Sequence, residues 1–151
     1  MQRIAVGITV ALGLVAAALL SACGGVASPT PSPADLGGVL NALASRGATI
    51  NQVVGGDAGC PDSTLHSNAA RIGLRVDGRD YEIHLFRWRR AADFEAATAA
   101  FDECVAAYAA GTSSVSIEVV AVPPWRAFGS GWSRQVTETV REALQAAAAG
   151  G

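Results

Sequence analysis

Apolar residues recur along the chain with three different spacings, and each spacing predicts a different kind of segment. The first is an unbroken run without charge from Ile4 to Leu20, preceded by Arg3. The run is short for a membrane-spanning helix, includes Gly7 and Gly13, and has no cationic residue closely following it. It therefore predicts a secretory signal segment, with a single transmembrane helix as the alternative.

A spacing of three or four residues predicts three amphipathic helices. The first begins after Asp35 as its N-cap and ends at Gly47, the second covers residues 91–111, and the third begins after Ser133. Their inward-facing residues are Leu36, Val39, Leu40 and Leu43; Phe94, Ala97, Phe101, Cys104, Val105 and Tyr108; and Val136, Val140, Leu144 and Ala147. Each helix therefore has one apolar stripe that must be buried against another element.

Alternation of apolar and polar residues predicts the strands. Residues 49–54 and residues 115–122 each form one strand, and Pro123-Pro124 ends the second of them. Residues 125–132 predict a short strand or a turn.

The clearest strand pattern is ARIGLRVDGRDYEIHLF, in which two alternating runs flank Asp77-Gly78. This pattern predicts a hairpin with a two-residue type I′ turn, and counting outward places Leu74 opposite Tyr81. One face then carries Ile72, Leu74, Tyr81, Ile83 and Leu85, and the other carries Arg71, Arg75, Asp80, Glu82 and His84. We expect the first face to join the core and the second to be largely solvated, with His84 as a surface histidine.

The order of the elements is α-β-β-β-α-β-(β)-α, which predicts the fold class. Helices near both ends with a meander between them are typical of an α+β domain. We expect two layers, with an antiparallel sheet and helices packed on one face, over residues 35–149. About 117 residues remain after the first 34, which is the size of one domain.

The charge balance excludes some functions. The net charge is −2 and every basic residue is an arginine. Nucleic-acid-binding domains are usually strongly basic, so we expect no nucleic acid partner. The absence of lysine excludes Schiff-base chemistry and a P-loop lysine.

The apolar run ends in Leu20-Ser21-Ala22-Cys23, followed by two glycines. These residues resemble the lipobox of bacterial lipoproteins. The resemblance implies that the Cys23 thiol carries a diacylglyceryl group and that the signal peptide, residues 1–22, is removed. The chain would then be anchored by lipid in a bacterial membrane, facing outside the cytoplasm, at the cell surface or in the periplasm.

Residues 23–34 predict a tether between this anchor and the domain. Three prolines alternate there with Ser and Thr, a composition that favours an extended, unpacked chain. The order of elements that follows is similar to that of small bacterial lipoprotein domains, a resemblance of layout that implies no activity.

Two further cysteines, Cys60 and Cys104, lie in the domain. In an exported chain such a pair is most simply a disulfide. The alternatives are a reactive thiol or two unpaired cysteines. A reactive thiol at Cys104 is disfavoured because Asp102 and Glu103 would raise its pKa.

Aromatic and basic residues gather in FRWRR and PPWRAFGSGW. We consider Trp88, Arg89, Trp125, Phe128 and Trp132 as a binding surface for an envelope protein, a glycan or a small ligand. The alternative is packing at the edge of the core, with cation–π contacts to nearby arginines.

Catalytic and metal-binding patterns are weak. Asp62, Ser63 and His66 suggest a hydrolase-like site, but residues so close in one loop rarely form a triad and no G-x-S-x-G occurs. Without Cys60, only Asp57, Asp62 and His66 remain near one another for zinc, so we expect no metal and no cofactor.

The sequence thus predicts a lipid-anchored, non-enzymatic binding or envelope-interaction domain. The alternatives are an envelope hydrolase and a structural surface protein without a ligand.

Overall fold

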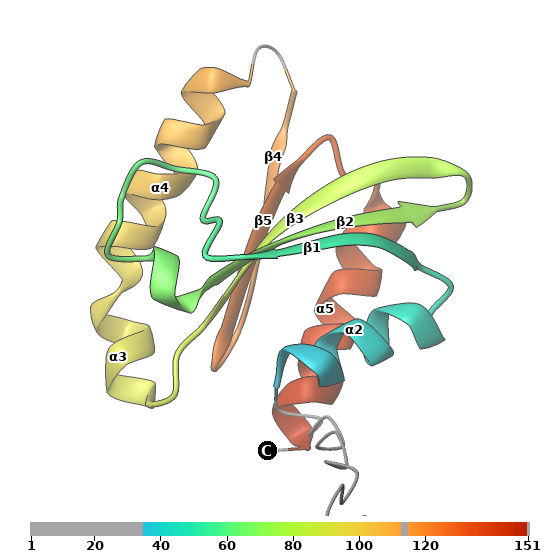
Figure 1. Cartoon of the computed structure of the whole chain (residues 1–151), viewed down its shortest axis with the longest axis horizontal. Helices are drawn as coiled ribbons and strands as arrows, with labels where there is room; N and C mark the ends of the chain where they lie inside the picture. The colour runs from blue at the N-terminus through green and yellow to red at the C-terminus, as the bar shows by residue number, and fades with distance from the viewer. Residues whose placement is uncertain (1–34, 113–114, 151) are drawn as a thin grey trace, which may run out of the picture. The chain divides into compact units, whose positions relative to one another are not determined.

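The computed structural model of the chain describes residues 35–112 and 115–150. The elements are α2 (Leu36–Ser45), β1 (Thr49–Gly55), η1 (His66–Asn68), β2 (Ala69–Val76), β3 (Arg79–Arg87), α3 (Ala91–Ala96), α4 (Thr98–Gly111), β4 (Ile117–Val122), β5 (Trp125–Ser130) and α5 (Arg134–Ala149) (Figure 1). The predicted α+β class and order of elements are confirmed. Residues 1–22, Cys23 and the tether lie outside the described residues. None of the described helices combines the length and apolar character needed to cross a membrane.

The strands form one antiparallel sheet in the order β1-β2-β3-β5-β4. The β2–β3 hairpin has the predicted register, with Leu74 opposite Tyr81. Asp77 and Gly78 have φ values of 49° and 77°, so both central residues have the positive φ of a type I′ turn. The alternating pattern therefore identified both the pairing and the turn.

The segment expected to be a short strand or a turn is an internal strand of the sheet, β5. It pairs with β3 on one side and β4 on the other, and five of its six residues are buried. Strand β4 begins at Ile117, two residues later than predicted.

Two helices begin at their predicted caps. Asp35 Oδ1 accepts a hydrogen bond of 2.9 Å from Gly38 N, and Ser133 Oγ accepts one of 3.3 Å from Val136 N. Each cap satisfies a backbone donor that has no partner within its helix.

The helix predicted over residues 91–111 is interrupted at Ala97, which ends α3 and begins α4. At this interruption Arg126 of β5 donates hydrogen bonds to Thr98 Oγ1 at 2.7 Å and to Phe94 O at 3.3 Å. The interruption thus provides acceptors for a buried arginine.

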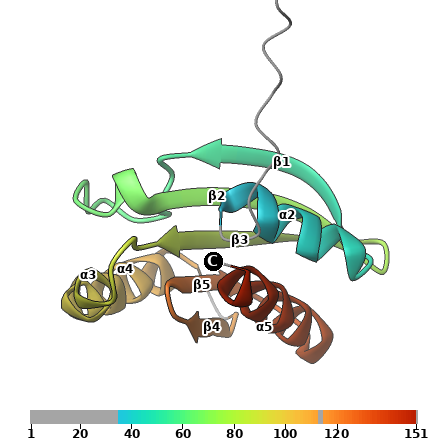
Figure 2. The ribbon, with the colours of Figure 1, turned by 90° about the horizontal axis from the view of Figure 1, so that it is seen from below.

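Helices cover both faces of the sheet (Figures 1 and 2). On one face α2 and α5 pack against each other and over a core that includes Ile72, Leu74 and Ile83. On the opposite face α3 and α4 cover a cluster of aromatic residues that includes Phe86 and Phe128. The α+β class is as expected, but the helices do not all lie on one face: α2 and α5 cover one face of the sheet, and α3 and α4 cover the other as a third layer.

The second face of the sheet carries large aromatic rings, and α3 and α4 form the third layer by covering them. His84 and Phe86 alternate with Ile83 and Leu85 along β3, so they share the face that was expected to be solvated. His84 lies opposite Phe128 of β5, which continues the aromatic surface across the sheet. Burial of this surface under α4 stabilises the fold by the hydrophobic effect.

Candidate functional site

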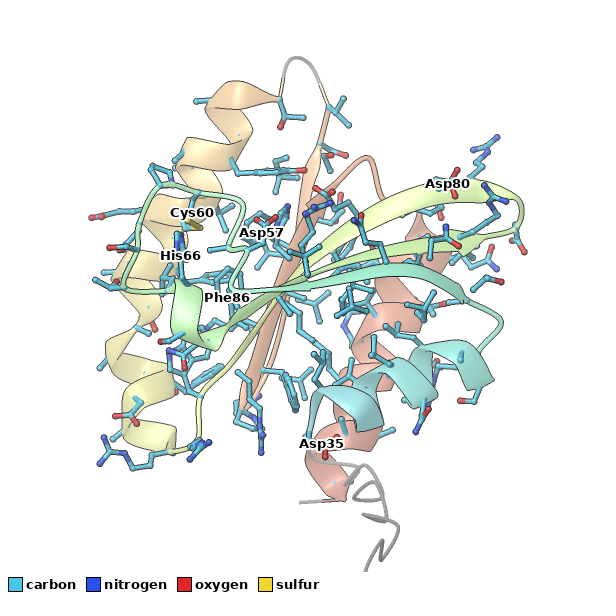
Figure 3. The ribbon with its side chains drawn as sticks, viewed as in Figure 1. Asp35, Asp57, Cys60, His66, Asp80 and Phe86 are labelled. Carbon is cyan, nitrogen blue, oxygen red and sulfur yellow. A yellow bond between two sulfur atoms is a disulfide. The ribbon has the colours of Figure 1, made fainter. Side chains whose placement is uncertain are left out.

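The loop between β1 and β2 is fixed to α4 by the Cys60–Cys104 disulfide, with the two Cα atoms 5.3 Å apart. The predicted disulfide is confirmed, and neither cysteine is a reactive thiol in this structure. Figure 3 shows Asp57, Cys60 and His66 in this loop beside α4. A shallow pocket of about 590 Å³ lies along the loop and is lined by all three residues.

A chain of four charged or titratable side chains lies where this loop meets the sheet. Arg71 of β2 donates a hydrogen bond to Asp57 at 2.7 Å and a second one to Glu82 at 3.0 Å. The other carboxylate oxygen of Glu82 lies 3.0 Å from His84 Nε2. Arg71 and His84 are direct partners across the hairpin, so the register brings these groups together.

His84 is buried, with 1% of its surface exposed, and the expectation of a surface histidine is wrong. Its ring stacks on Phe128 at 4.9 Å and meets the edge of Tyr108 at 5.0 Å between centroids. A Cβ at Gly59 would come within 2.5 Å of the ring, so only glycine lets the loop backbone lie there. The loop therefore covers a sheet position that periodicity alone assigns to solvent.

Burial lowers the pKa of His84, because desolvation disfavours the charged imidazolium. The carboxylates of Glu82 and Asp57 and the backbone of Asp57 act in the opposite direction and offset only part of the effect. His84 Nδ1 is buried and no described atom meets hydrogen-bond geometry with it. The hydrogen bond from Arg71 lowers the pKa of Asp57, which keeps that carboxylate charged.

The sequence could have indicated this cluster. The hairpin register alone places Arg71 opposite His84, and the disulfide brings the loop onto the same face as α4. The alternating pattern gave no sign that the backbone at Gly59 lies against the ring of His84, because this contact depends on the path of the loop backbone.

The aromatic residues considered as a binding surface are mainly core residues. Trp88, Trp125, Phe128 and Trp132 have 4%, 1%, 0% and 5% of their surfaces exposed, whereas Arg89 is exposed. Trp125 and Trp132 belong to the core under α2 and α5, and Trp88 and Phe128 to the cluster under α3 and α4. These residues do not share one exposed surface.

Cation–π contacts are present, as the alternative interpretation expected. The Arg126 guanidinium carbon lies 4.3 Å from the centroid of Phe94 and 5.9 Å from that of Trp88. That of Arg87 lies 5.3 Å from the centroid of Trp125. These arginines support the core rather than an exposed aromatic patch.

One groove remains beside Trp88, and we call it the Trp88 groove. It has a volume of about 740 Å³ and lies between the end of the β1–β2 loop, the segment after β3 and the α3–α4 interruption. Its lining includes Leu65, Asn68, Trp88, Arg89 and Asp93. Among the predicted surface residues, only Trp88 and Arg89 line it.

The three residues of the hydrolase alternative make other contacts. Asp62 Oδ1 accepts hydrogen bonds from Thr64 N at 2.8 Å and Thr64 Oγ1 at 2.7 Å. His66 Nε2 lies 3.4 Å from Cys60 O. His66 N donates a backbone hydrogen bond of 3.3 Å to Ser63 O. Within the described ranges no side-chain hydrogen bond joins Asp62, Ser63 and His66 to one another, and no three metal-binding side chains converge.

Comparisons with protein-family models, with curated proteins and with solved structures found no significant match.

Proposed function

We propose that the protein is a lipoprotein anchored through Cys23 to a bacterial membrane, on the side facing away from the cytoplasm. Its domain would be a non-enzymatic binding domain that presents the Trp88 groove to a component of the envelope.

The Cys60–Cys104 disulfide is the observation that carries this proposal. A structural disulfide forms and persists outside the reducing cytosol, so the bond supports export. The chain has three cysteines, and this pairing leaves Cys23, the cysteine of the lipobox-like sequence, available for a lipid. Two or more acyl chains would hold the domain at the membrane durably.

The binding role is supported by the Trp88 groove and by the way its walls are held. The disulfide fixes the β1–β2 loop to α4, and Arg126 holds the α3–α4 interruption. A groove with walls on rigid elements can bind a ligand at a small entropic cost.

The anchor is tested by Cys23→Ala in the full chain, expressed in a bacterial host. We expect the wild type to partition into detergent with the added mass of a lipid, and the variant to remain an uncut precursor or to leave the detergent phase. The matched control is the Cys60→Ala/Cys104→Ala double variant, which should keep the lipid. Identical mass and processing in Cys23→Ala and the wild type would contradict the proposal.

A further inference from the structure

A buried cation, Arg126, lies beside the ring of Trp88 and forms no ion pair with a carboxylate of the described residues. Arg126 has 7% of its surface exposed, and it donates hydrogen bonds to the neutral acceptors Thr98 Oγ1 and Phe94 O. Its Nε is buried without a hydrogen-bond partner in the described part of the chain. Nearby aromatic rings offset part of the free-energy cost of burying this charge. One of them is the ring of Trp88, whose centroid lies 5.9 Å from the guanidinium carbon of Arg126.

The rim of the groove adds more positive than negative charge. Arg90 forms an ion pair with Asp93, with N–O distances of 2.7 and 2.8 Å. Arg89 is exposed and makes no hydrogen bond or ion pair with another described residue. Asp93 is the only carboxylate among the described residues that line the groove, so Arg89 and the buried Arg126 leave the local field positive.

The remaining walls are apolar or neutral. Leu65, Trp88, Ala97 and Ala100 supply apolar surface, and Asn68 supplies an amide. The volume of about 740 Å³ lies within the range of small-molecule sites. An apolar wall beside an unpaired guanidinium suits a molecule with an apolar body and an anionic end, since arginine can bind a carboxylate through two hydrogen bonds.

We propose that the Trp88 groove binds a small organic carboxylate, with the carboxylate on Arg89 and the apolar body against Trp88 and Leu65. This inference rests on the proposed binding role and names the ligand class of the same groove.

The test is equilibrium dialysis of the lipidated full chain in detergent micelles, with naphthoate and its neutral isostere naphthamide as probes and empty micelles as background. We expect naphthoate to bind about tenfold more tightly than naphthamide, because a charge-assisted pair is stronger than a neutral one. Arg89→Gln should remove this preference and leave naphthamide binding unchanged. Added salt should weaken naphthoate binding only.

The matched control is Arg79→Gln, which removes the same charge from an exposed arginine in the β2–β3 hairpin. It should bind both probes like the wild type. Equal effects of the Arg79 and Arg89 substitutions, or equal affinity of the wild type for both probes, would overturn the assignment of an anionic ligand. If the wild type bound naphthoate and naphthamide equally well, the groove would still be a binding site, but for neutral ligands. The proposed lipid anchor is tested separately by Cys23→Ala.

Discussion

At the scale of single residues, His84 shows most clearly how burial and charge oppose each other. Its ring is enclosed by Phe128, Tyr108 and the loop backbone at Gly59, while Glu82 lies 3.0 Å from its Nε2. Burial prevails, and the pKa of His84 is lowered. A neutral ring that donates from Nε2 to the Glu82 carboxylate fits this site, because that carboxylate can only accept.

The lowered pKa predicts a pH dependence of stability. As the pH falls below the ordinary histidine value of 6.5, the unfolded chain takes up a proton before the folded chain does. The free energy of unfolding should therefore fall with pH from there down to the lower pKa of the folded state. In His84→Gln this part of the dependence should disappear, as measured by urea denaturation from about pH 7.5 to 5.

The matched control for this experiment is His66→Gln, which removes an exposed histidine from the adjoining loop. Comparing it with His84→Gln separates the loss of the buried imidazole from the loss of an exposed one. Parallel curves for the wild type and His84→Gln would show that His84 does not contribute to the pH dependence.

At the scale of elements, the helix caps and the hairpin turn were predicted correctly, because each depends on residues that are close together in the sequence. Asp35 and Ser133 cap their helices as expected, and Asp77-Gly78 turns the hairpin. The interruption at Ala97 was missed because the apolar stripe continues through it. Its acceptors are used by Arg126, which is distant in the sequence, so no short-range signal marked it.

The hairpin turn predicts a measurable cost for Gly78→Val. A Cβ at Gly78 would meet no atom within 4 Å, so any cost comes from its φ of 77° rather than from a clash. We expect a loss of about 1–2 kcal/mol in the free energy of unfolding. The register should persist, because a one-residue slip would turn Ile72, Leu74 and Ile83 away from the core.

The control is Gly55→Val at the end of β1, where a Cβ also has open space and the backbone does not have positive φ. Urea denaturation should show no comparable loss there. A stability of Gly78→Val equal to that of Gly55→Val would contradict the type I′ assignment.

At the scale of the whole domain, the sequence predicted the class, the order of elements, the hairpin register and the disulfide. It did not predict that both faces of the sheet are covered. Periodicity shows which residues share a face, but it does not show which element packs over that face. For the same reason Trp125 and Phe128 looked available for binding, although β5 is an internal strand between β3 and β4 and both residues are buried.

The disulfide joins the β1–β2 loop to α4 on one face of the sheet, and its removal gives the last prediction. The bond closes a separation of 44 residues, for which the chain-entropy model gives about 4 kcal/mol as an upper value. In Cys60→Ala/Cys104→Ala we expect a lower free energy of unfolding and faster amide hydrogen exchange in the β1–β2 loop. Exchange in α2 and α5 should follow only the global loss of stability, because these helices pack on the opposite face.

Release of the loop should also expose His84, since the backbone at Gly59 lies on its ring. An imidazole-modifying reagent should therefore react mainly with His66 in the wild type and with both histidines in the double variant. Non-reducing peptide mapping of the exported wild type must first show the Cys60–Cys104 link. Two thiols that can be alkylated in that protein, or an unchanged reactivity of His84 in the double variant, would mean that the disulfide does not hold the loop over the sheet.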